Sequence, residues 1–209
     1  KSYGLLMAHP INKARMAKGK RPANSLWFWG EGRKPGLSDF YRTYGLKGAV
    51  VSAVDLVKGL GICANMKVIN VAGATGNIDT NFTGKMNASV EFLRNGGDFV
   101  YLHMEAPDEC GHRHEIDNKV KSIELIDSLV VGPLRKALGK IDDFKMLIMP
   151  DHPTPLALRT HTHDAVPYLI YDSRKDTGCK GRRYTESCAK DTGKYVAKGH
   201  ELMKHFIDD

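Results

Sequence analysis

Short apolar runs alternate along the chain with segments whose apolar residues recur at helical spacing. The runs that predict buried strands are residues 49–54, 66–73, 98–106, 144–150 and 166–171. Between the third and fourth runs a helix is predicted by apolar residues three or four positions apart, namely Val120, Ile123, Ile126, Val130 and Leu134. Continuous apolar strands that alternate with helices predict an α/β fold, with a mainly parallel sheet and helices on both faces.

Both ends of the chain also carry helical patterns. The first residues predict a helix that continues to about Lys18, where a stretch with Gly and Pro interrupts the pattern. Residues 25–30, SLWFWG, predict a short strand that leads into a loop, and residues 192–207 predict a closing amphipathic helix. Ser38-Asp39 precedes a helical segment, so we interpret the pair as a helix N-cap and not as a nucleophile.

Length and composition indicate a soluble globular protein. The 209 residues suffice for one domain with a full core and a small appendage, and 42% of them are hydrophobic. No apolar stretch approaches the roughly 20 residues of a membrane span, and the first residues show no signal peptide. The four cysteines form no CxxC pair, which predicts reduced thiols and a cytoplasmic location. They are Cys63, Cys110, Cys179 and Cys188.

The chain carries a net charge of +7. Its basic residues are spread along the sequence and do not gather in one run, which is typical of a solvated, mildly basic surface. We therefore expect no nucleic-acid partner and no membrane partner. A small phosphorylated substrate would also fit this charge.

Unusual polar residues follow three of the predicted elements. Asp108 and His112 come just after the third strand, and Asp151-His152 ends the fourth. Both His161 and His163 lie in the loop that leads into the fifth. The carboxyl ends of strands in an open α/β sheet meet at one edge, so these segments are expected to converge. Residues four apart share a helix face and can hold one ion, whereas adjacent side chains diverge and can serve different ions.

Carboxylates and imidazoles without a thiolate suit Zn²⁺, Mn²⁺ or a similar divalent ion. Two such ions about 3.5–4 Å apart form a clamp for phosphoryl chemistry. Each pair taken alone could instead be a catalytic dyad or a hydrogen-bonded turn that caps a strand. Cys110 is interpreted as a small buried filler and His103 as a satisfied core histidine. The GATG stretch lacks the lysine spacing of a P-loop.

Several of these segments resemble one known family along nearly the whole chain. APDECGH, PDHPTP and THTHDAVP resemble the alkaline-phosphatase superfamily, specifically the cofactor-independent phosphoglycerate mutases of archaeal type. The stretches ANSLWFWGEGRKP, GAVVSAVDLVKGLG and GATGNIDTNFTGK are similar to that family as well. The resemblance implies an alkaline-phosphatase-like core.

The resemblance also implies two divalent metal ions, Mn²⁺ or Zn²⁺, with Mg²⁺ as a further option. Asp108, His112 and His161 match the ligands of one ion, and Asp151 and His152 match ligands of the second. His163 is then a neighbour and not a ligand. The implied reaction interconverts 3-phosphoglycerate and 2-phosphoglycerate through a serine, which takes the phosphate and returns it to the other hydroxyl.

The chain departs from the family at its start. The family's early Asp-Gly, its Ser-Asp nucleophile and most of its inserted cap domain have no counterpart. The resemblance therefore implies an incomplete core: residues 1–24 are the end of the cap and a return linker, and residues 25–209 are the C-terminal part of the core domain. The serine is expected outside this chain, in the N-terminal part of the same enzyme. This chain alone is expected to be inactive.

Substrate contacts are expected from five basic residues, Arg15, Arg21, Arg33, Lys58 and Lys85. The substrate has an alternative, because WFWGEG and Glu105 stand where the mutases more often show basic residues. These choices are similar to a bacterial sister group proposed to act as a homoserine kinase. A carboxylate beside a phosphate site weakens binding of a polyanion but tolerates an ammonium. A third hypothesis is a non-catalytic metal-binding module.

Overall fold

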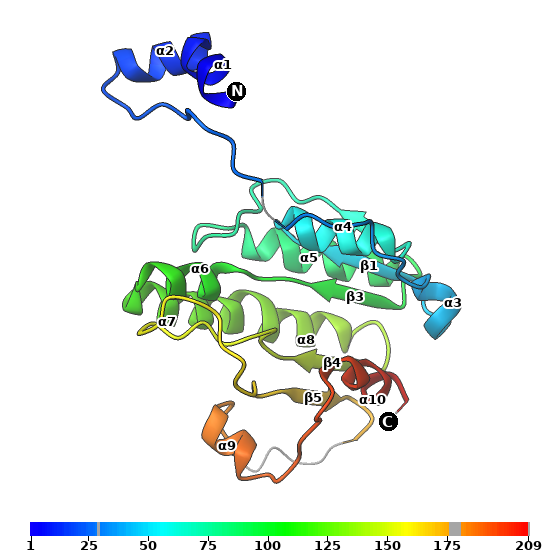
Figure 1. The fold of residues 1–209 in the computed structure, drawn as a ribbon. Helices are drawn as coiled ribbons and strands as arrows, with labels where there is room; N and C mark the ends of the chain where they lie inside the picture. The colour runs from blue at the N-terminus through cyan, green and yellow to red at the C-terminus, as the bar shows by residue number, and fades with distance from the viewer. Residues whose placement is uncertain (29, 176–180, 209) are drawn as a thin grey trace. The chain divides into compact units, whose positions relative to one another are not determined.

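The computed structural model describes residues 1–28, 30–175 and 181–208, and the chain divides between Gly36 and Leu37 into two compact units (Figure 1). Trp29 and Cys179 lie outside the described residues. The predicted division at residues 24 and 25 concerns the role of each segment in a longer enzyme and stays a prediction. Each unit is described by itself.

The first unit, Lys1–Gly36, contains two short helices, α1 (Ser2–Ala8) and α2 (Pro10–Ala17). The buried side chain of Asn12 joins them to the following segment. Its amide donates to the carbonyls of Leu6 at 2.7 Å and Ala23 at 2.8 Å, and its oxygen accepts from the Ala23 N–H at 2.9 Å. The prediction of a strand at residues 25–30 was wrong. The described residues of that range form no strand, because no neighbouring strand pairs with them.

The second unit is built on a parallel sheet of three strands in the order β2-β1-β3. These strands are β1 (Gly48–Val51), β2 (Lys67–Ile69) and β3 (Phe99–Leu102). Each parallel connection runs through a helix, α4 (Asp55–Cys63) after β1 and α5 (Phe82–Arg94) after β2. The predicted α/β class with a parallel sheet is confirmed.

Helices cover both faces of this sheet, as alternate residues of β1 show. Val50 points to α4, where Gly61 lies against its side chain. Val51 points to the opposite face together with its register partner Leu102, which packs on the α5 residues of the main core. That core consists of Phe82, Met86, Val90, Ala106 and Val130.

The helix predicted around residues 120–134 forms as one continuous helical segment with a π-helical turn inside it. It comprises α7 (Ile116–Ile126), the π-turn η1 (Asp127–Val131) and α8 (Gly132–Leu138). Val130 is buried as the pattern predicts, but Val120 and Ile123 each remain 54% exposed. The amphipathic pattern therefore packs against the core only in its second half.

The last two predicted strands exist, but they form a separate antiparallel ribbon. β4 (Lys145–Ile148) pairs with β5 (Leu169–Asp172), with Lys145 opposite Asp172. Neither strand contains a fully buried residue, so the expectation of two more buried strands was wrong. An apolar run predicts a strand but does not say whether its neighbour runs parallel or antiparallel to it. That direction depends on the path of the chain between the two strands.

Shorter helices complete the unit. They are α3 (Phe40–Tyr44), α6 (Ala106–Arg113), α9 (Glu186–Lys190), the 3₁₀ turn η2 (Gly199–Glu201) and α10 (Leu202–Asp208). Asp39 caps α3 by accepting from the Arg42 N–H at 2.8 Å, as predicted. The closing helix begins ten residues later than residue 192, at Leu202, after Gly193 adopts a positive φ of 65°. Among the described residues, no helix has the length and apolar character needed to cross a membrane.

Two glycines of α4 allow a direct test of how this helix packs on the sheet. A Cβ at Gly61 would lie 2.7 Å from Cγ2 of Val50, whereas a Cβ at Gly59 would meet nothing within 4 Å. We expect Gly61→Ala to lower the free energy of unfolding by about 1–2 kcal/mol through overpacking. The control Gly59→Ala should raise it by about 0.5–1 kcal/mol. Urea unfolding measures both, and equal effects would contradict this packing.

Candidate metal centre

The centre begins with α6, which starts shortly after the end of β3. Pro107 lies in the first turn of the helix, where the N–H that proline lacks would have no intrahelical partner. Asp108 lies in the same turn and His112 one turn further, so the two share a face, as their spacing predicts, with Asp108 Oδ2 3.3 Å from His112 Nε2. The helix ends at His114, which adopts the left-handed conformation and donates from Nδ1 to the Leu156 carbonyl at 2.6 Å.

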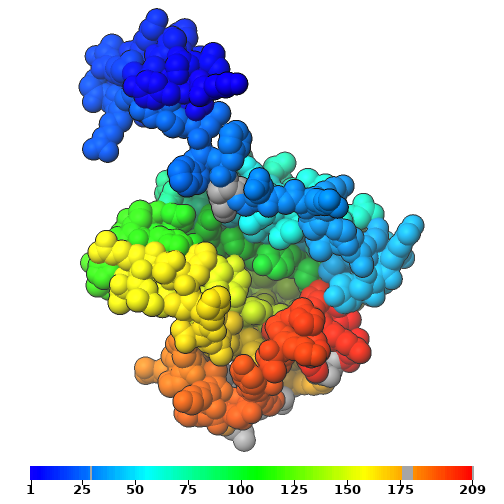
Figure 2. Space-filling view, viewed as in Figure 1, coloured from blue at the N-terminus to red at the C-terminus, as the bar shows by residue number. Residues whose placement is uncertain are grey.

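His161 reaches the same point from the loop between β4 and β5. Its Nε2 lies 3.3 Å from Asp108 Oδ1 and 3.0 Å from His112 Nε2. One ligand atom from each of these three residues therefore lies within 4.8 Å of the other two. In Figure 2 the yellow loop that carries His161 lies against the green helices α6 and α7. The convergence expected at the carboxyl ends of the strands is present in the structure.

A backbone carbonyl sets the proton position on His112. The Arg159 carbonyl lies 2.9 Å from His112 Nδ1 and can only accept, so Nδ1 carries the hydrogen of this bond. In the neutral ring Nε2 then keeps its lone pair, and it is Nε2 that faces Asp108 and His161. Two imidazole nitrogens and a carboxylate in this arrangement fit a divalent ion such as Zn²⁺ or Mn²⁺.

Asp151 and His152 lie beside this group. Asp151 Oδ2 is 3.4 Å from His152 Nε2, and the His152 ring lies 3.7 Å from the His161 ring between centroids. Among the described residues, no third acidic, histidine or cysteine side chain joins them in a second group of three. The pair is thus placed next to the first group, as predicted, but offers only two ligands of its own.

Other side chains near the centre have structural roles. Cys110 is fully buried in α6, as predicted for a filler, and burial raises the pKa of its thiol. His103 bonds through Nδ1 to Ser52 Oγ at 3.2 Å, and burial lowers the pKa of its imidazole. His163 is exposed.

Lys85 on α5 and Glu105 after β3 are two ionisable side chains whose pKa values are shifted by burial. Lys85 is 0% exposed, and its Nζ lies 3.4 Å from the carbonyls of Thr75 and His103. Burial lowers the pKa of this ammonium, against the opposing effect of Glu105. Burial also raises the pKa of Glu105, with the charges of Glu109 and Asp108 acting in the same direction. The centre is therefore flanked by one buried cation and one partly buried carboxylate.

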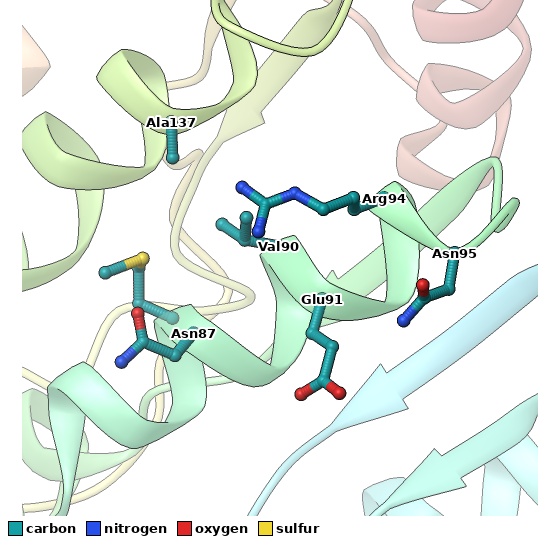
Figure 3. A pocket seen from close by; sticks show the side chains of 7 residues that line it. Asn87, Val90, Glu91, Arg94, Asn95 and Ala137 are labelled. Carbon is teal, nitrogen blue, oxygen red and sulfur yellow. The ribbon is translucent and has the colours of Figure 1, made fainter.

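The other basic residues predicted to bind substrate belong to two parts of the chain. Arg15, Arg21 and Arg33 belong to the first unit, where Arg15 donates from Nε to the Arg21 carbonyl at 3.1 Å. Lys58 lies on α4 and contacts Asp55 at 3.4 Å. A pocket between α5 and α8 is lined by Asn87, Glu91 and Arg94 on α5 and by Ala137 on α8 (Figure 3). It contains none of the predicted site residues.

Two contributors escaped prediction from the sequence. The Arg159 carbonyl orients His112 from a residue with a positive φ of 55°, and the Thr154 hydroxyl donates to Asp108 Oδ1. A non-glycine residue with positive φ cannot be identified from its letter alone. The only signal for Thr154 was its place in the PDHPTP motif.

The profile of the Metalloenzyme superfamily matches residues 4–207. A probable 2,3-bisphosphoglycerate-independent phosphoglycerate mutase of Geobacter sulfurreducens is 45% identical over 204 residues, which cover 98% of this chain and 51% of that protein. A 2,3-bisphosphoglycerate-independent phosphoglycerate mutase of Methanothrix thermoacetophila is also 45% identical, over 97% of this chain and 52% of that one. The chain thus spans about half the length of the curated relatives it matches.

Two solved structures share the fold. A protein from Pyrococcus horikoshii superimposes with a TM-score of 0.73 and 33% identity, over 90% of this chain and 49% of that chain. A cofactor-independent phosphoglycerate mutase from Thermoplasma acidophilum superimposes with a TM-score of 0.62 and 23% identity, over 98% of this chain and 48% of that chain. At that identity the second likeness concerns the fold alone.

The buried ammonium of Lys85 predicts a pH-dependent stability. In the folded chain the pKa of Lys85 lies below the ordinary 10.5. The neutral amine therefore contributes stability to the fold that is fully present above pH 10.5 and is lost as the pH falls through the lowered pKa. Lys85→Met should therefore raise the free energy of unfolding at about pH 7. The gain should shrink as the pH approaches about 10.

Urea unfolding at both pH values measures this effect. Lys121→Met is the control, because that lysine is exposed on α7 beside Glu124, and it should change stability little at either pH. A gain from Lys85→Met that stays equal at both pH values would contradict the burial of a charge at this position.

Proposed function

Because the chain belongs to the Metalloenzyme superfamily, we propose that it is the metal-binding half of a 2,3-bisphosphoglycerate-independent phosphoglycerate mutase. The proposed reaction interconverts 3-phosphoglycerate and 2-phosphoglycerate through a phosphoserine. The serine would lie in the part of the enzyme that corresponds to the other half of the relatives. That part would be the partner that completes the active site.

One observation carries this proposal. Asp108 and His112 lie on one helix and His161 comes from a distant loop, yet their ligand atoms gather within 4.8 Å. A turn that merely caps a strand needs only local partners, whereas this group joins α6 to a loop nearly fifty residues later. The relatives that match almost the whole chain are named as phosphoglycerate mutases.

We propose two divalent ions, Mn²⁺ or Zn²⁺, with Asp108, His112 and His161 holding one and with Asp151 and His152 holding part of the other. When bound, such ions lower the pKa of a nearby hydroxyl and stabilise negative charge on phosphoryl oxygens. The chain's own residues prepare this site before an ion arrives. The Arg159 carbonyl fixes the tautomer of His112, and the Asp108 carboxylate directs one oxygen to each imidazole.

Substrate recognition is proposed for the basic residues identified above. Lys85 supports this assignment best, because its buried ammonium has no carboxylate at hydrogen-bond distance among the described residues. A buried charge of this kind costs stability, and such costs concentrate at functional sites. The positive charge of Lys58 also lowers the pKa of Lys85. The assignments of Arg15, Arg21 and Arg33, all in the first unit, stay predictions.

Glu105 favours a second candidate function. Burial raises the pKa of its carboxyl, and the charges of Glu109, Asp108 and Asp151 act in the same direction. A trianionic phosphoglycerate would meet repulsion among these carboxylates. An amino-acid substrate with an ammonium, such as homoserine, would be tolerated better. We therefore keep phosphoryl transfer to an amino-acid hydroxyl as the alternative within the same superfamily.

Phosphorus NMR distinguishes the two functions. The full-length protein that contains this chain, loaded with Mn²⁺, would be given 3-phosphoglycerate without any bisphosphoglycerate. Appearance of 2-phosphoglycerate is expected and would establish the mutase. Its absence from a metal-loaded protein would favour the homoserine alternative, and inactivity toward both substrates would favour a non-catalytic metal-binding module.

Matched variants connect this activity to the centre. Asp108→Asn in the full-length protein should reduce turnover by about 100-fold or more, because it removes a charge from the ion's ligands. Asp117→Asn is the control, since Asp117 is exposed on α7 and outside the cluster.

The 209-residue chain by itself should show no turnover, and normal turnover would contradict the expected location of the serine.

A further inference from the structure

Thr154 occupies the position between the two proposed ion sites. It follows β4 two residues after His152 and is only 5% exposed. Its hydroxyl contacts Asp108 Oδ1 on one side and lies 3.4 Å from His152 Nδ1 on the other. Thr154 is therefore the residue whose side chain touches a proposed ligand of each ion.

The directions of these two hydrogen bonds follow from the chemistry of the groups. An ionised carboxylate can only accept, so the Thr154 hydroxyl donates its single hydrogen to Asp108. The hydroxyl oxygen then faces His152 Nδ1 with lone pairs only, so it can accept a hydrogen from that atom but cannot donate one to it. An ion held by His152 would take Nε2, the atom that lies 3.4 Å from Asp151 Oδ2, and Nδ1 would keep its hydrogen for the hydroxyl.

The surrounding structure holds Thr154 in this position. Its carbonyl accepts from Lys119 Nζ at 2.8 Å. On the α6 side the fit depends on a glycine, because a Cβ at Gly111 would lie 2.6 Å from the Thr154 carbonyl oxygen and 2.9 Å from its Cγ2. The preceding carbonyl, that of Pro153, accepts from the Thr162 N–H at 3.2 Å and so joins this loop to the neighbour of His161.

We propose that Thr154 is a positioning residue that couples the two ion sites. Through one hydroxyl it orients the Asp108 carboxylate and accepts the Nδ1 hydrogen that His152 would keep when Nε2 holds an ion. The inference rests on the proposed metal centre for its effect on ion binding. Its effect on the orientation of the Asp108 carboxylate concerns the metal-free chain and stands apart from that function.

The test compares Thr154→Val, which removes the hydroxyl at nearly the same volume, with Thr154→Ser, which keeps it. In crystals of the metal-free chain, the Asp108 carboxylate should keep Oδ1 toward residue 154 in the unaltered chain and in Thr154→Ser. In Thr154→Val the carboxylate should turn away from the side chain of residue 154. Calorimetry with Mn²⁺ alone should show about tenfold weaker binding for Thr154→Val and retained binding for Thr154→Ser.

The outcomes separate the two proposals. An unchanged orientation of the Asp108 carboxylate in Thr154→Val, or unchanged Mn²⁺ affinity in a chain that binds the ion, would overturn the role of Thr154. Failure of the unaltered chain to bind Mn²⁺ would contradict the proposed metal centre, while the crystal structures would still decide whether the hydroxyl orients Asp108. If Thr154→Val loses its cooperative thermal unfolding, Thr154→Ala replaces it with the same two readouts and the same expected results.

Discussion

The carboxylate of Asp108 is the contact on which the described centre depends. One oxygen lies 3.3 Å from His112 and the other 3.3 Å from His161, and the Thr154 hydroxyl donates to the second. Three segments thus meet at a single side chain: α6, the turn after β4 and the loop before β5. β3 ends shortly before α6 begins. The start of the helix therefore lies at the edge of the sheet where the loops around β4 and β5 return.

The chain keeps features near this point that a purely structural protein would avoid. The Lys85 ammonium is buried against two carbonyls, Glu105 is partly buried among other carboxylates, and two imidazole nitrogens face each other at 3.0 Å. Lys85 and Glu105 cost stability when charged in these surroundings. A divalent cation would be held by the Asp108 carboxylate and by the two imidazole nitrogens, which otherwise hydrogen-bond each other, so the group is better explained by function than by packing.

Much of this could be predicted from the residues themselves. The i, i+4 spacing of Asp108 and His112 and the position of Asp151-His152 after an apolar run were sufficient, because helix period and strand ends are local properties. The Arg159 carbonyl and the Thr154 hydroxyl were missed because they depend on loop conformations that no local pattern specifies. The exposure of Val120 and Ile123 was missed for a related reason, since a helical pattern marks an apolar face without naming what covers it.

The central claim is that this chain alone brings together the ligands of one divalent ion. A crystal of the 209-residue chain grown with Zn²⁺ and measured at the zinc absorption edge tests it most directly. The account predicts an anomalous peak about 2.0–2.2 Å from Nε2 of His112, Nε2 of His161 and an oxygen of Asp108. An ordered Asp108 cluster without such a peak, or zinc bound only at other residues, would contradict it.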